Sequence, residues 1–331
     1  MNFNRLGLKR LISTSYKPSP VANSQLGLFG DDKTLPKSKG RPKITANTFI
    51  INEVGDIDGD GSFTLEDIAK QLKANKNNEW TPLEGDGDFR SDECVELLKQ
   101  SDIVVTNPPF SLFREYVTSL FEYQKQFLII GSMNAITYKE IFAFIKNNKM
   151  WLGNGFNAGN AYFSTPNVRG DLASGVYDEK NGLVKFRNCH WFTNLDHGRR
   201  HRPIALMSTA ENLKFNKKMQ GKTAYDCYEN YNAIEVSFTD ATPSDYKGVM
   251  GVPISFLDKY SPEQFEIVGM CENEDLYKQK TKFYTSTDCK QAYVDKFGKK
   301  GTYDLNASGV VIRDGLREKV YQRILIKHKK K

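Results

Sequence analysis

Apolar and polar residues follow a pattern that predicts a series of strands and helices in the first half of the chain. The run 103–106 is β-branched and uncharged, which is typical of a short strand buried on both faces of a parallel sheet. Apolar residues then recur at helical spacing over 111–123, and Ser111 is placed to cap that helix. Further buried strands are predicted at 127–131 and 150–153. This alternation predicts a doubly wound α/β sheet with short connections.

The second half has a different pattern, in which short strand-like pieces alternate with loops and no repeat is evident. The predicted strands lie at 183–186, 190–193, 233–236, 265–269, 309–313 and 322–326. We therefore divide the chain into an α/β domain, residues 1–165, and a mixed α+β region, residues 166–331.

Residues 17–48 interrupt the α/β domain with a segment rich in Pro, Gly, Ser and Lys, the composition of a flexible insertion. Within it, Gln25-Leu-Gly-Leu-Phe29 resembles the pentapeptide by which bacterial replication and repair proteins dock on the sliding clamp. Packing on the protein's own surface is the alternative. Gly40-Arg-Pro42 resembles an AT-hook core, with a solvated basic linker as the alternative.

An acidic loop at 56–67 has the spacing of an EF-hand calcium loop. The ligand positions are taken by Asp56, Asp58, Asp60 and Asp67. Asp stands where the closing Glu is usual, and the segment before the loop, 49–54, has the pattern of a strand and not of a helix. The alternative to a calcium site is an acidic turn that caps the following helix. In either case we expect a structural role.

Asn107-Pro-Pro-Phe110 directly follows the strand at 103–106, where open α/β folds bind ligands. The side-chain carbonyl of Asn107 and the backbone carbonyl of Pro108 can both accept hydrogen bonds from one amine. Pro109 helps to fix these acceptors, and Phe110 offers an aromatic face to a planar base. This predicts a site that holds an amine with its lone pair toward an electrophile. A rigid Pro-Pro turn with a packed Phe is the alternative.

Several motifs, with this one among them, occur in a fixed order along the chain. They are Gly85-Asp-Gly-Asp-Phe-Arg-Ser-Asp-Glu-Cys94 and the segments 102–113, 127–131, 134–141, 191–196, 248–254 and 321–324. Together they resemble the EcoRI-type adenine-specific DNA methyltransferases, from about residue 45 onward and at 6–16. The resemblance implies a Rossmann-like methyltransferase sheet followed by a C-terminal target-recognition region. It also implies methyl transfer from S-adenosylmethionine to the N6 amino group of a flipped adenine in double-stranded DNA.

The same resemblance implies a cofactor-binding role for Asp86, Asp88 and Phe89. They match the third-strand motif of the family, in which an acidic side chain contacts the adenine of the cofactor and an apolar ring packs against it. The alternative is an Asp-Gly turn followed by a helix cap at Ser91.

In the family, the strand at 10–16 is the second of the sheet, so the first strand and its cofactor loop would lie upstream of Met1. We therefore expect a sheet that lacks its first strand. An inactive DNA-binding remnant is one alternative function that follows. A protein or RNA methyltransferase is another, because the amine site also suits glutamine side chains.

Charge and composition agree with a nucleic-acid partner. The net charge is +7, and Asp196-His-Gly-Arg-Arg-His-Arg202 is a dense basic cluster. We expect Arg199, Arg200 and Arg202 to contact DNA, with a solvated surface as the alternative. Five scattered cysteines argue for a reducing cytoplasm and against a zinc site. We expect a cytoplasmic protein that is encoded by a bacterium or a phage. No apolar run reaches membrane-spanning length.

Overall fold

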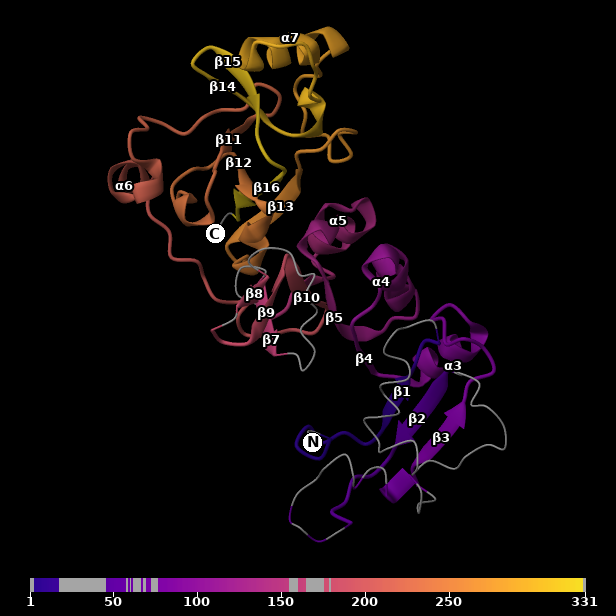
Figure 1. Cartoon of the computed structure of the whole chain (residues 1–331). Coiled ribbons are helices and arrows are strands. Elements are labelled where there is room, and N and C mark those ends of the chain that lie inside the picture. Colours follow the sequence, from indigo (N-terminus) through magenta and orange to yellow (C-terminus); the bar gives the residue numbers. More distant parts are fainter. Residues whose placement is uncertain are drawn as a thin grey trace. The chain divides into compact units, whose positions relative to one another are not determined.

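The computed structural model contains helices and sheets throughout, which confirms the mixed α/β class (Figure 1). It describes residues 3–17, 46–57, 59, 61, 67, 70–72, 77–154, 160–164, 176–178 and 180–329. The chain forms two compact units, one of residues 1–104 and 121–125 and the other of residues 105–120 and 126–331. Within the described ranges, no helix has the length and apolar character needed to cross a membrane.

Three antiparallel strands form the sheet of the first unit, in the order β1-β2-β3. They are β1 (Leu11–Thr14), β2 (Asn47–Ile51) and β3 (Glu79–Pro82). Phe49 and Trp80 are partners across β2 and β3, and their rings stack with centroids 6.3 Å apart. This aromatic pair contributes to the pairing of the two strands.

The helix of this unit is α3 (Asp92–Gln100), which begins at the predicted cap. The Ser91 hydroxyl accepts a hydrogen bond from the backbone N–H of Cys94 at 3.3 Å. Cys94 and the partly buried Leu97 then pack with Ala46 and Leu83. A side-chain cap and a small apolar cluster therefore hold α3 beside the end of β3.

The acidic loop uses its described carboxylates as hydrogen-bond acceptors for backbone groups. Asp56 accepts from the N–H groups of Gly59 and Gly61 at 2.7 and 2.8 Å, and the buried Asp67 accepts from Ile57 at 2.9 Å. These are the contacts of an acidic turn. Asp58, Asp60, the pentapeptide 25–29 and the segment 40–42 lie outside the described residues. Among the residues that are described, no group of His, Cys, Asp or Glu could hold a metal ion.

The sheet that follows the Asn-Pro-Pro-Phe motif has the order β4-β5-β10-β6. Its strands are β4 (Ile103–Thr106), β5 (Gln126–Ser132), β10 (Cys189–Thr193) and β6 (Trp151–Leu152). The strand-helix alternation predicted a doubly wound sheet, but β10 lies between β5 and β6 and runs antiparallel to both. A local pattern cannot reveal this insertion, because the pairing partners are about sixty residues apart in the chain.

The prediction that β4 is buried on both faces was wrong. Ile103 and Val105 are 47% and 65% exposed, whereas Val104 and Thr106 are partly buried. Residues two apart share a face of the sheet, so the face that carries Ile103 and Val105 is exposed and the face that carries Val104 and Thr106 is partly covered. Composition predicted the strand correctly but not its surroundings.

Helices follow both β4 and β5. They are η1 (Phe110–Leu112), α4 (Phe113–Glu122), η2 (Met133–Thr137) and α5 (Lys139–Lys146). The prediction that Ser111 caps a helix was also wrong, since Ser111 lies inside η1 and the preceding Pro109 is the cap residue. Pro109 has no side-chain acceptor, and its backbone carbonyl accepts from the N–H of Leu112 at 3.0 Å, which closes the turn that begins η1 and places Ser111 past the cap position.

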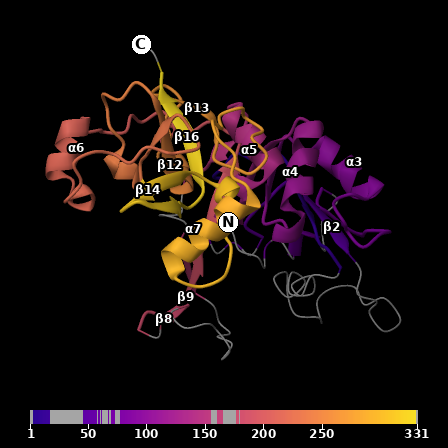
Figure 2. The ribbon, with the colours of Figure 1, turned by 90° about the horizontal axis from the view of Figure 1, so that it is seen from above.

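The rest of the second unit is made of small sheets, and every strand predicted there is present. An antiparallel sheet of order β7-β9-β8 contains β7 (Asn160–Ser164), β8 (Tyr177–Asp178) and β9 (Leu183–Arg187). A mixed sheet of order β11-β12-β16-β13 contains β11 (Ala233–Glu235), β12 (Val249–Pro253), β13 (Phe265–Met270) and β16 (Arg323–His328). Figure 2 shows β12, β16 and β13 side by side.

The second unit contains further helices and one hairpin. They are α6 (Thr209–Phe215), η3 (Lys217–Met219), η4 (Thr239–Ala241), η5 (Ile254–Asp258), α7 (Ser286–Phe297), η6 (Leu305–Ala307), β14 (Val310–Arg313) and β15 (Leu316–Lys319). The strands β14 and β15 form an antiparallel hairpin that contacts α7. Its turn, Asp314-Gly315, has positive φ at both residues, as a two-residue hairpin turn requires.

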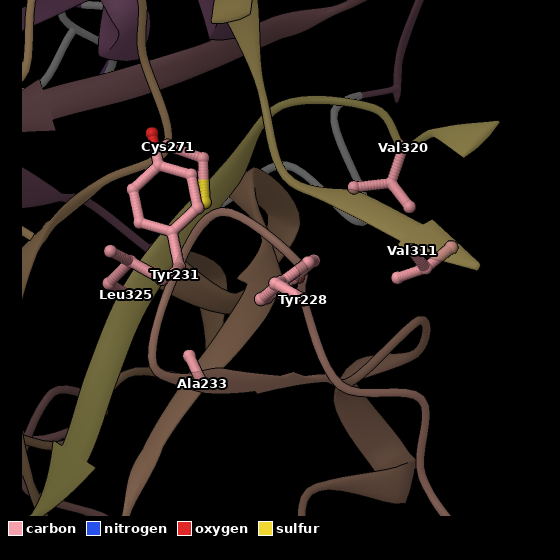
Figure 3. Packing of buried hydrophobic residues seen from close by; sticks show 7 residues of the cluster. All are labelled: Tyr228, Tyr231, Ala233, Cys271, Val311, Val320 and Leu325. Carbon is pink, nitrogen blue, oxygen red and sulfur yellow. The ribbon is translucent and has the colours of Figure 1, made fainter. Parts of the chain in front are cut away.

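A buried cluster ties the mixed sheet to the hairpin (Figure 3). It consists of Tyr228, Tyr231, Ala233, Cys271, Val311, Val320 and Leu325. The ring of Tyr228 occupies the space that a Cβ would need at Gly251 and Gly309, where its atoms would approach to 2.2 and 2.4 Å. Glycine at both positions therefore makes room for this ring.

An ion pair is buried next to the same tyrosine. Glu235 and Arg323 are 2% and 7% exposed, and Arg323 Nη2 donates to Glu235 Oε1 at 2.6 Å. The Tyr228 hydroxyl donates to the other carboxylate oxygen, and burial raises the pKa of this tyrosine well above its usual value. The two charges are therefore paired and hydrogen-bonded, as burial requires.

Replacing Glu235 by Ala should lower the free energy of unfolding by about 3–5 kcal/mol, because it leaves the Arg323 guanidinium buried without its partner. Urea titration followed by circular dichroism measures the change. Lys218→Ala is the matched control, since it breaks the exposed pair with Asp240 and should cost less than about 1 kcal/mol. Equal effects of the two variants would contradict this interpretation.

Candidate active site

The Asn-Pro-Pro-Phe loop joins the end of β4 to the start of η1. Pro108 is buried, whereas Asn107 and Phe110 are exposed, the latter at 42%. Pro109 has φ −61° and ψ 128°, and its carbonyl accepts from the N–H of Leu112 at 3.0 Å. The loop is therefore anchored through its first proline while its amide and its aromatic ring are open to a ligand.

A second anchor follows immediately at Phe113, the first residue of α4. Its ring is buried, and its centroid lies 5.1 Å from that of Phe192 on β10 in an edge-to-face arrangement. A Cβ at Gly131 of β5 would lie 2.5 Å from the Phe113 ring and 2.9 Å from that of Phe192. Glycine at position 131 thus allows both rings to lie against β5, which fixes the start of α4 and the loop before it.

The loop after β5 is also held by hydrogen bonds. The Ser132 hydroxyl accepts from the N–H of Asn134 at 3.3 Å, and the N–H of Met133 donates to the carbonyl of Asn188 at 2.8 Å. Asn188 has φ +62°, a conformation that asparagine tolerates better than most residues. The segment before β10 therefore helps to shape the chain that follows β5.

The residues predicted to bind the cofactor form one turn in the first unit. The N–H of Asp88 donates to Asp86 Oδ1 at 3.0 Å, and Gly87 has φ +79° with the carbonyl of Ser15 2.1 Å from where a Cβ would be. Asp88 also forms an ion pair with Arg90 at 2.7 Å, and the hydrogen bond from Arg90 holds the pKa of this aspartate below its usual value. Asp86 is exposed and Phe89 is partly buried.

This geometry contains the Asp-Gly turn and the Ser91 cap that were the alternative interpretation. It leaves the carboxylate of Asp86 more accessible than that of Asp88. An exposed carboxylate beside an aromatic ring fits the hydroxyl or amino groups of an adenosine. The cofactor role of Asp86, Asp88 and Phe89 remains a prediction.

Arg199, the first arginine predicted to contact DNA, is paired inside the second unit. Its Nη2 donates to Asp258 Oδ2 at 2.7 Å, and the other oxygen of Asp258 lies 3.0 Å from Nε2 of the fully buried His190. Burial raises the pKa of Asp258, but the hydrogen bond from His190 and the charge of Arg199 outweigh it and hold the pKa below its usual value. No sequence signal indicated this cluster, because Asp258 lies 59 residues from Arg199.

Arg200 is buried against β6. Its guanidinium carbon lies 3.7 Å from the centroid of the Trp151 ring, Nη1 lies 3.3 Å from Asp196 Oδ1, and Nη2 donates to Asn148. Arg202 is exposed. The structure therefore commits the side chains of Arg199 and Arg200 to internal contacts and leaves that of Arg202 at the surface.

His201 bridges two carboxylates next to these arginines. Nδ1 lies 2.7 Å from Glu263 Oε1, and Nε2 lies 2.7 Å from Asp196 Oδ1. The hydrogen bond with Glu263, followed by that with Asp196, raises the pKa of His201. Three residues of the basic cluster, Arg199, Arg200 and His201, are thus paired with acidic residues.

A strand, an exposed Asn-Pro-Pro-Phe loop and a helix on an α/β framework fit an enzyme that transfers a methyl group to an exocyclic amine. The family described as adenine-specific methyltransferase EcoRI matches residues 1–329. The chain is 48% identical to the type II methyltransferase M.EcoRI of Escherichia coli over 279 residues, which are 83% of this chain and 74% of that protein. It is 38% identical to the type II methyltransferase M.MpnI of Mycoplasma pneumoniae over 237 residues, 71% and 68% of the respective chains.

No solved structure gives a significant match. The chain belongs to the EcoRI family of adenine-specific methyltransferases and is an adenine-specific DNA methyltransferase.

Proposed function

We propose that this chain is the modification enzyme of a type II restriction-modification system, acting in the cytoplasm of a bacterial cell. It transfers a methyl group from S-adenosylmethionine to the N6 amino group of adenine in double-stranded DNA. The observation that carries the proposal is the loop at the end of β4, which presents Asn107 and Phe110 over the buried Pro108. The family match and the two bacterial relatives support it.

The loop can act on a flipped adenine in two ways. The ring of Phe110 stacks on the base, and the carbonyl oxygens of Asn107 and Pro108 accept hydrogen bonds from the N6 amino group. As the amine attacks, positive charge develops on N6, and both acceptors stabilise it. The buried Pro108 and the fixed φ of Pro109 hold the acceptors in place, so little reorganisation is needed.

S-adenosylmethionine, when bound, supplies an electrophilic methyl group. In the first unit, Asp86 is the group best placed to accept from the adenosine part, and Phe89 offers its ring. Asp88 shapes the turn through Arg90. We assign the sheet β4-β5-β10-β6 to the Rossmann-like methyltransferase fold that the family implies, and target recognition to the remainder of residues 166–331.

Asn107→Ala should lower the rate of methyl transfer at least about 10²-fold, comparable to removing one preorganised hydrogen-bonding group from an active site. DNA affinity should barely change, since phosphate contacts dominate it. Transfer of radiolabelled methyl groups to DNA measures the rate, and gel shift measures affinity. Asn134→Ala is the matched control, an exposed asparagine in η2 whose loss should leave the rate unchanged. Full turnover by the Asn107 variant would refute the assignment.

Asp86→Ala should weaken S-adenosylmethionine binding about tenfold, the value of one hydrogen bond to a charged acceptor. Titration calorimetry measures this affinity directly. Glu96→Ala provides the control, because Glu96 is an exposed carboxylate on α3 that pairs only locally with Lys99. Unchanged affinity in the Asp86 variant would mean that the adenosine binds elsewhere.

Arg200 and Arg202 should respond differently to replacement by Ala. Arg200→Ala should lower the melting temperature, because it removes a buried cation from Trp151 and Asp196. Arg202→Ala should leave the melting temperature unchanged. It should lower the slope of log DNA affinity against log salt by the amount expected for about one phosphate contact. Thermal melting and affinity measured at several salt concentrations separate the two effects. A lower melting temperature for Arg202→Ala, or an unchanged one for Arg200→Ala, would contradict this division.

A further inference from the structure

Arg114 is an exposed cation in the first turn of α4, one residue after the buried Phe113. Its guanidinium carbon lies 5.1 Å from the centroid of the Tyr138 ring. Tyr138 is the residue that precedes α5, directly after η2. The pair therefore joins the helix that follows β4 to the segment that follows β5.

The position of Arg114 relative to the Asn-Pro-Pro-Phe loop follows from helix geometry. Residues 110–112 of η1 continue into α4 at Phe113 without a break. Phe110 begins the 3-10 helix η1 and Arg114 lies four residues later in α4, so the two residues are separated by about one helical turn along the chain. Arg114 therefore follows, within about one helical turn, the residue to which the proposed function assigns the target base.

The charge of Arg114 has no counterpart in the described part of the chain, where no ion pair links it to a carboxylate. This distinguishes it from most described arginines of the second unit. Arg199, Arg200, Arg313, Arg317 and Arg323 all pair with Asp or Glu.

We propose that Arg114 binds a phosphate of the DNA strand that carries the flipped adenine, and that Tyr138 orients its guanidinium. This rests on the proposed function, since the base must lie on Phe110. Stacking on an aromatic face leaves the N–H edge of a guanidinium free, and that edge matches two phosphate oxygens. A base that is stacked on Phe110 brings its own sugar-phosphate chain to the same end of the helix as Arg114. Arg114 therefore stabilises the extruded nucleotide through its backbone.

The test uses the full chain and a duplex that contains the site at which the wild-type enzyme places N6-methyladenine, mapped by sequencing of methylated DNA. Arg114→Ala should weaken duplex binding about tenfold and lower the slope of log affinity against log salt by about 0.9, the value for one phosphate. Methyl transfer at saturating DNA should change less than KM for DNA. Arg114→Lys should restore the salt slope but only part of the affinity, because an ammonium lacks the planar fork. Tyr138→Leu should weaken binding and keep the slope.

The decisive experiment replaces phosphates near the target adenine one at a time by methylphosphonate. At one position the wild-type enzyme should lose the same tenfold in DNA affinity, whereas the Arg114→Ala variant should lose no further affinity. Additive losses at every position, or an unchanged salt slope in Arg114→Ala with an unchanged melting temperature, would overturn the proposal. The two proposals fail in different ways: a wild-type enzyme that places no N6-methyladenine in DNA would refute the proposed function, whereas methylation by the wild type with unchanged DNA binding by Arg114→Ala would overturn only the role of Arg114.

Discussion

The contact of Phe113 and Phe192 with the bare backbone at Gly131 is the constraint on which the candidate active site depends. Gly131 belongs to β5, Phe113 begins α4, and Phe192 comes from β10, so one contact joins three elements. A side chain at position 131 would displace both rings. The start of α4 would move with Phe113, and the loop that presents Asn107 would move with α4. A site whose chemistry consists mainly of holding an amine in place is sensitive to such a shift.

The second theme of the structure is the neutralisation of charge. The chain carries +7 overall, yet the basic cluster at 199–202 is engaged by Asp258, Asp196 and Glu263. Further arginines are paired around the mixed sheet, including the buried Arg323. Net charge is therefore a poor guide to the surface that meets DNA. Arg114 and Arg202 are exposed and form no ion pair with the part of the chain that the structure describes, which makes them better candidates than the densest run of positive residues.

The proposed division of labour follows from these two features. We assign the positioning of the amine and the stacking of the base to the loop between β4 and η1, whose rigidity comes from two prolines and a buried phenylalanine. The mixed sheet is held by a core of tyrosines around a buried ion pair, so its loops can vary around a stable centre. The strand β10 belongs to residues 166–331 but lies in the same sheet as β4, β5 and β6, so the proposed recognition region and the proposed methyltransferase sheet share a strand.

The sequence by itself determined the family, the strand-loop-helix order around Asn107 and most of the strands, because these depend on local composition and spacing. The prolines and β-branched residues near 103–109 allow few conformations. Only the tertiary structure decided that β10 separates β5 from β6, and that Arg200 is buried on Trp151. Both depend on partners about fifty or more residues away, and local propensity carries no information about such pairings. The same holds for Ser111, whose capping signal was overridden when the preceding proline turned the chain into η1.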